Sequence, residues 1–84
     1  MTPQQIKEVI EKAVPHSTAY VRDPQNDGQH FEAFVVSSLF GTMMLIKQHQ
    51  MVMKVLKNAF GGALHALALK TFTPETWNKG ASHG

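Results

Sequence analysis

The side chains best suited to metal chemistry in this chain are its five histidines, because cysteine is absent. Without a thiol the chain can form no disulfide and no thiolate metal site of its own. Any bound metal would need nitrogen or oxygen ligands, or donors from another protein. His65 is the leading candidate, because it opens the alternating segment "HALALK" on the side of Leu67 and Leu69. A metal-ligating histidine and one hydrogen-bonded to a backbone carbonyl would look alike at this position.

The other histidines have less distinctive surroundings. His30 opens the segment "HFEAFVVS", where strand alternation places it on the side of Glu32, so we expect a surface or hydrogen-bonded position. His49 lies at helical spacing from apolar residues and is expected near a buried seam. His16 and His83 belong to no recognisable constellation.

The elements that must position these side chains follow from apolar periodicity and from helix-start and turn signals. Thr2 and Gln5 fit a capping box, Thr42 is the expected N-cap of the second helix, and the glycines at 61 and 62 should end that helix. In chain order we expect a helix over 3–14, strands over 17–23 and 30–37, a helix over 43–60, a strand over 64–72, and a short helix from 74 that carries Trp77.

The predicted order is therefore αββαβα, an α+β fold with a three-stranded sheet and helices packed on one face. With 84 residues the chain makes one small domain, expected over residues 1–78 and followed by a flexible tail over 79–84. The residues predicted to face the helices are Ala19, Val21, Phe31, Ala33, Val35, Leu67 and Leu69. Tyr20 and Phe34 are expected on the opposite, open face.

The second helix has a predicted apolar stripe and a predicted wet side. The stripe consists of Leu45, Val52, Leu56, Ala59 and Phe60, and the wet side of Lys47, Gln50, Lys54 and Lys57. Net charge is only +2, yet no acid occurs between Glu32 and Glu75. This basic half could bind an acidic partner or nucleic acid, but composition alone favours a solvated helix face. Of the methionines at 43, 44, 51 and 53, helical spacing predicts that at least two fill the core.

Other function classes have little support. We expect no enzyme, because no Ser/His/Asp arrangement, paired carboxylates or phosphate-binding glycine loop is present. The N-terminus lacks the layout of a signal peptide, and the apolar run "AFVVSSLFGTMMLI" is too short and too broken to span a bilayer. A cytoplasmic protein without membrane contact is expected.

In these segments the chain resembles the BolA family, through "HALALKTFTPETW", "HFEAFVVSSLF" and "IKQHQMVMKVL" in this order and spacing. Its short first hairpin loop is similar to the compact bacterial branch (IbaG/YrbA-like). The resemblance implies a fold similar to a class II KH domain. It also implies a monothiol glutaredoxin partner, with glutathione, that shares a [2Fe–2S] cluster with the BolA-like protein. Iron–sulfur handling, iron regulation, stress response and transcription regulation are the processes associated with such proteins.

By this resemblance His65 aligns with the histidine implicated as a cluster ligand, and His30 is a weaker candidate for a second contact. No cluster is expected on this chain alone, which we expect to be a monomer or a homodimer. The hairpin loop has no histidine or cysteine that could be the second ligand found in much of the family. In addition, "LFGT" departs from the family's Phe-x-Gly turn, because Gly41 directly follows Phe40.

Two alternatives remain open at this point. The first is a nucleic-acid-binding transcriptional regulator that uses Lys47, Lys54 and Lys57, although no G-x-x-G loop is present to clamp phosphates and the binding would be weak and salt-dependent. The second is an adaptor that binds the glutaredoxin without contacting iron.

Overall fold

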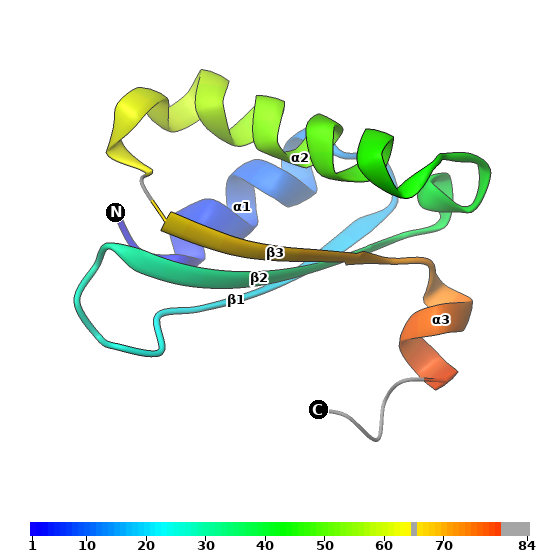
Figure 1. The fold of residues 1–84 in the computed structure, drawn as a ribbon, viewed down its shortest axis with the longest axis horizontal. Helices are drawn as coiled ribbons and strands as arrows, with labels where there is room; N and C mark the ends of the chain where they lie inside the picture. The colour runs from blue at the N-terminus through cyan, green and yellow to red at the C-terminus, as the bar shows by residue number, and fades with distance from the viewer. Residues whose placement is uncertain (65, 80–84) are drawn as a thin grey trace.

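The computed structural model describes residues 1–64 and 66–79 (Figure 1). The predicted order of helices and strands is confirmed, with two short 3₁₀ segments, η1 and η2, on either side of the second helix. In chain order the elements are α1 (Pro3–Ala13), β1 (Ser17–Arg22), β2 (His30–Ser37), η1 (Ser38–Thr42), α2 (Leu45–Phe60), η2 (Gly61–Ala63), β3 (Ala66–Phe72) and α3 (Pro74–Lys79). The predicted tail over 79–84 begins within α3, and residues 80–84 lie outside the described part of the chain.

The sheet has the strand order β1-β2-β3. β1 and β2 form the predicted antiparallel hairpin, in which Tyr20 pairs with Phe34. β2 and β3 are parallel, and their register begins with His30 opposite Ala66. Parallel neighbours require a crossover connection, and α2 supplies it. The start of β3 is thereby brought to the start of β2, at the end of the sheet where the hairpin loop lies (Figure 1).

The hydrophobic core lies between the sheet and the two long helices, which cover the same face of the sheet (Figure 1). Strand alternation explains its composition, because every second residue of β2 from Phe31 onward points to that face. Of the residues predicted to face inward, Ala19, Phe31, Ala33 and Val35 are buried, and Val21, Leu67 and Leu69 pack against the core at its edge.

The short helix α3 contacts the opposite face of the sheet. The ring of Trp77 stacks on Tyr20 with centroids 5.0 Å apart and planes 13° apart, and it also contacts Phe34 and Phe72 at 5.9 and 5.1 Å. The expectation that helices pack on one face therefore holds for α1 and α2, whereas α3 uses the other face. The face predicted to be open carries an aromatic cluster, because three rings there lose exposed area when Trp77 covers them.

Local signals set most of the helix ends. The capping box is confirmed, since Thr2 Oγ1 accepts the Gln5 N–H at 3.2 Å and Gln5 Oε1 accepts the Thr2 N–H at 2.9 Å. Gly61 ends α2 with a φ of 59°, a value that L side chains rarely adopt. The prediction for Thr42 was wrong: it belongs to η1, and its hydroxyl donates to the Leu39 carbonyl at 3.3 Å. The N-cap of α2 is Met44, without a side-chain cap bond.

The turn "LFGT" needs no left-handed residue, because neither Gly41 nor Thr42 has a positive φ. Ser37 stabilises this turn: its hydroxyl oxygen accepts the Leu39 N–H at 3.1 Å, and its proton is donated to the Pro15 carbonyl at 2.6 Å. Among the residues that the structure describes, no helix is long and apolar enough to cross a membrane.

Candidate functional site

The principal candidate ligand, His65, lies outside the described residues, but both of its chain neighbours are within them. Leu64 lines a groove beside α2, and Ala66 begins β3 directly opposite His30. The parallel register therefore brings His30, the weaker candidate, next to the residue that follows position 65. Sequence alternation alone gives no such relation, because the two segments are separated by more than thirty positions.

His30 is half exposed and held in place by a carboxylate of the hairpin loop. Its Nδ1 lies 2.6 Å from Asp27 Oδ2. The backbone N–H groups of His30 and Gln29 donate to the other oxygen, Asp27 Oδ1, at 3.0 and 2.9 Å. The pKa of Asp27 is held well below its usual range. The main cause is the backbone bond from His30, followed by the backbone bond from Gln29 and then by the side-chain bond to His30. The position agrees with the hydrogen-bonded surface role expected from sequence.

This arrangement also suits a ligand histidine. A carboxylate on one ring nitrogen fixes the orientation of the imidazole and leaves Nε2 for a metal, as is usual for ligating histidines. The Asp27–His30 spacing was present in the sequence but carried no signal until the loop conformation was known. Asp23 orders that loop by accepting the N–H groups of Asp27 and Gly28 at 3.2 and 2.7 Å.

A shallow cavity of about 480 Å³ lies beside His30, between the hairpin loop and the start of β3. Glu32, on its wall, is bound to Arg22, whose Nε lies 2.6 Å from Glu32 Oε1. Within residues 1–64 and 66–79, no group of three histidine or carboxylate side chains is placed to hold a metal ion.

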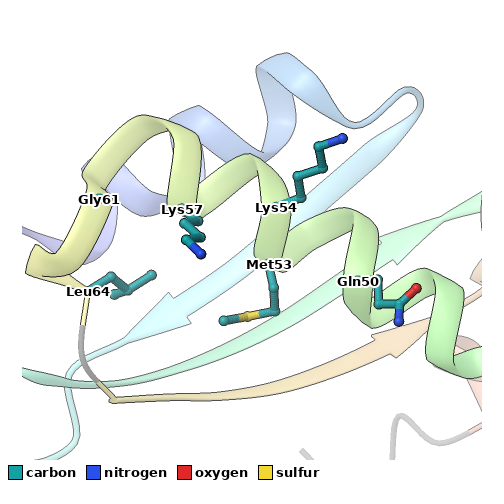
Figure 2. Close-up of a pocket in the computed structure, with 6 residues that line it drawn as sticks. All are labelled: Gln50, Met53, Lys54, Lys57, Gly61 and Leu64. Carbon is teal, nitrogen blue, oxygen red and sulfur yellow. The ribbon is translucent and has the colours of Figure 1, made fainter.

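A second groove, of about 440 Å³, runs along α2 toward Leu64 (Figure 2). It is lined by Gln50, Met53, Lys54, Lys57, Gly61 and Leu64, and in this view Lys57 lies between Leu64 and Met53. Lys54 and Lys57, two of the three lysines predicted to bind nucleic acid, thus line the same groove as the apolar side chains of Met53 and Leu64, which form its floor. Lys47, the third, is exposed on the same helix but does not line the groove.

The inward stripe of α2 is confirmed in part, because Val52 and Leu56 are buried and Phe60 packs against the core. Leu45 is 63% exposed and Ala59 is also exposed, and Gln48 is buried four residues before Val52. Gln48 takes the place expected for Leu45 because its amide satisfies backbone carbonyls at the η1–α2 junction. His49 is half-buried beside this stripe. The core prediction for the methionines is confirmed, since Met43 and Met51 pack against the core.

The model of the family described as BolA-like proteins matches residues 2–76 of this chain. The chain belongs to the BolA family. A BolA-like protein of Dictyostelium discoideum is 36% identical over 73 residues, which are 86% of this chain and 60% of that longer protein. The "DNA-binding transcriptional regulator BolA" of Haemophilus influenzae is 31% identical, over 86% of this chain and 81% of its own length.

Solved BolA structures share the fold of this BolA-family chain. A bolA homologue from Coxiella burnetii matches with a TM-score of 0.79 and 32% identity, covering 93% of this chain and 97% of that one. Yeast Fra2 matches with a TM-score of 0.73 and 31% identity, covering 100% and 94%. The α+β fold with a three-stranded sheet is therefore that of the family. The relatives are named as regulators or BolA-like proteins rather than as enzymes.

Proposed function

We propose that this BolA-family protein is the partner of a monothiol glutaredoxin and shares a bridging [2Fe–2S] cluster with it. In this proposal His65 is a cluster ligand, and the glutaredoxin with its glutathione provides the sulfur ligands. The cluster is cargo that the two proteins hold together in iron–sulfur handling or iron and stress regulation. The compact bacterial branch and a cytoplasmic location stay predictions.

The observation that carries the proposal is the pairing of His30 with Ala66 in a chain without cysteine. This pairing places the imidazole of His30, which Asp27 already orients, at the end of the sheet where β3 begins. Neutral imidazole is a known replacement for thiolate on iron of a [2Fe–2S] cluster.

What the cluster would gain here is a ligand without negative charge. Replacing thiolate by imidazole raises the reduction potential of a [2Fe–2S] cluster. The residues of this chain would supply the nitrogen donor, orient it, and cover one side of the shared site. His30 would make the second contact through Nε2, because Asp27 engages its Nδ1.

The test mixes each variant anaerobically with cluster-loaded monothiol glutaredoxin and follows visible absorption and circular dichroism. We expect the wild type to perturb both spectra, His65→Ala to abolish that perturbation, and His30→Ala to reduce it. His16→Asn is the matched control, because His16 is exposed and has a φ of 57°, a conformation that asparagine tolerates. A perturbation that persists unchanged in His65→Ala would remove this histidine from the ligand set.

A second candidate function is DNA binding, supported by the name of the Haemophilus influenzae relative and by the three exposed lysines of α2. Phosphate contacts by Lys47, Lys54 and Lys57 would give weak binding that falls steeply with salt. Fluorescence anisotropy with duplex DNA at two salt concentrations tests it, and sequence-selective binding at nanomolar concentration would favour this function. Binding of cluster-free glutaredoxin that survives His65→Ala, together with no perturbation of the cluster spectra, would instead favour the adaptor.

A further inference from the structure

We propose that the groove lined by Met53, Lys54, Lys57 and Leu64 docks an acidic segment of the partner protein that carries a large apolar side chain. This inference rests on the proposed function for the identity of the partner. It adds a contact that is separate from the cluster and requires no metal. It also assigns Lys54 and Lys57 to protein recognition rather than to nucleic acid.

The floor of the groove is suited to an apolar side chain. Met53 is 40% exposed although it is a large hydrophobic residue, and it reaches into the groove from α2, while Leu64 closes the end that leads to β3 (Figure 2). A volume of about 440 Å³ is at the lower end of the range for ligand pockets. Methionine adapts its shape easily, which favours it at surfaces that bind a partner.

The rim of the groove is suited to carboxylates. Lys54 and Lys57 both line it, and the chain has no acid between Glu32 and Glu75 that could neutralise them locally. The ion pairs formed within the described parts of the chain use other cations, namely Lys7, Arg22 and Lys79, and the carboxylate of Asp27 is bonded to His30. An acidic segment would therefore meet two lysines without first breaking an ion pair among the described residues. Opposite charge at a rim also increases the association rate.

The same geometry argues against nucleic acid as the occupant. Single-stranded nucleic acid is bound by aromatic side chains on which bases stack, together with a basic groove. The aromatic residues Tyr20, Phe34 and Trp77 lie on the opposite face of the sheet and contact one another. Duplex phosphates would contact Lys47 as readily as its neighbours, and they would leave the Met53–Leu64 floor without a function.

The place of the groove in the chain links it to the proposed site. Leu64 is directly followed by His65 in the sequence. A segment seated on Leu64 would hold the partner beside the position that we propose as the cluster ligand. Docking and cluster sharing would then reinforce each other, because the first contact raises the effective concentration of the second.

The first experiment measures, by calorimetry, the affinity of cluster-free monothiol glutaredoxin for three variants. We expect the double variant Lys54→Glu/Lys57→Glu to bind at least about tenfold more weakly than the wild type, and Lys47→Glu to stay within about twofold, because close charge pairs contribute most. Lys47 is the matched control, since it is an exposed lysine of α2 outside the groove. Lys54→Gln/Lys57→Gln repeats the test with neutral side chains should charge reversal impair folding.

The second experiment compares Met53→Gln with Met44→Gln, two exposed methionines of which only Met53 lines the groove. We expect weaker binding of cluster-free glutaredoxin by Met53→Gln alone. The groove would be overturned as the docking site if Lys47→Glu lost as much affinity as the Lys54→Glu/Lys57→Glu double variant. It would also be overturned if the wild type did not bind cluster-free glutaredoxin. Duplex DNA that displaces the glutaredoxin and depends on Lys47 would overturn it as well.

These outcomes are independent of the cluster test. His65→Ala should retain its affinity for cluster-free glutaredoxin, because the proposed docking needs no metal. If the cluster spectra fail to respond while the groove variants still lose affinity, the cluster proposal fails and the docking proposal stands. If the spectra respond normally and the groove variants bind as the wild type does, the docking proposal fails alone.

Discussion

Gln48 is the buried polar side chain that connects three parts of this fold, and its removal is the most informative test of the structure. Its Nε2 donates to the carbonyls of Phe40 and Met43 at 3.0 and 2.9 Å, and its Oε1 accepts the hydroxyl of Thr71 at 2.6 Å. These bonds join η1, the start of α2 and β3. We predict that Gln48→Leu destabilises the protein even though leucine suits a core position.

The magnitude follows from the three lost bonds. Each contributes about 1 kcal/mol net, so their loss costs about 3 kcal/mol, and additional apolar burial by leucine offsets about 1 kcal/mol. The expected decrease in the free energy of unfolding is therefore about 2 kcal/mol, which lowers the melting temperature by about 8–16 °C in a chain of this size. Thr71→Val breaks a single bond and should cost about 1 kcal/mol.

The assay is urea unfolding followed by far-ultraviolet circular dichroism. The matched control is Gln50→Leu, the same chemical change two residues further along α2 at an exposed position, for which we expect a change within about 0.5 kcal/mol. In the double variant of Gln48 and Thr71, the loss should be smaller than the sum of the single losses, because the two share one bond. Equal stability of the Gln48 and Gln50 variants would refute this reasoning.

Three further predictions concern local features. Hydrogen bonds from Lys7 and from the Ala19 backbone lower the pKa of Glu11, so the charged form stabilises the fold above the unfolded pKa of about 4.3. Glu11→Gln should be less stable than the wild type in urea at pH 7, and this difference should shrink as the pH falls below that value. Gly61→Ala should cost about 1 kcal/mol or more in urea unfolding, because its φ is 59°. Tyr20→Ala should cost about 1 kcal/mol and shift the emission of the single tryptophan, whose ring stacks on it.

Each of these has its own control. The free energy of unfolding of Glu11→Gln is compared with that of the wild type at each pH, so that the titration of other carboxylates cancels. A stability difference that widens in acid contradicts the stabilising role of charged Glu11. Gly62→Ala is the control for Gly61, because it has neither a positive φ nor a neighbour within 4 Å of an added Cβ. An unchanged emission spectrum in Tyr20→Ala would contradict the stacked arrangement.

The sequence by itself determined the features that depend on neighbouring residues. The alternation of β2, the capping box at Thr2 and the glycine at 61 each act within a few positions along the chain. Their physical basis is local, because side-chain period and backbone φ depend on few residues. The order of elements and most of the inward-facing strand residues could therefore be predicted. The BolA resemblance rested on the same segments.

Only the tertiary structure decided which partners distant residues meet. Trp77 could have packed on either face of the sheet. It packs on the face opposite α1 and α2, against the rings of Tyr20 and Phe34, which are far from it in sequence. Gln48 rather than Leu45 faces the core, and there its amide donates to the carbonyls of Phe40 and Met43. The parallel register that sets His30 opposite Ala66 depends on the α2 crossover, a contact over more than thirty residues that no local pattern encodes.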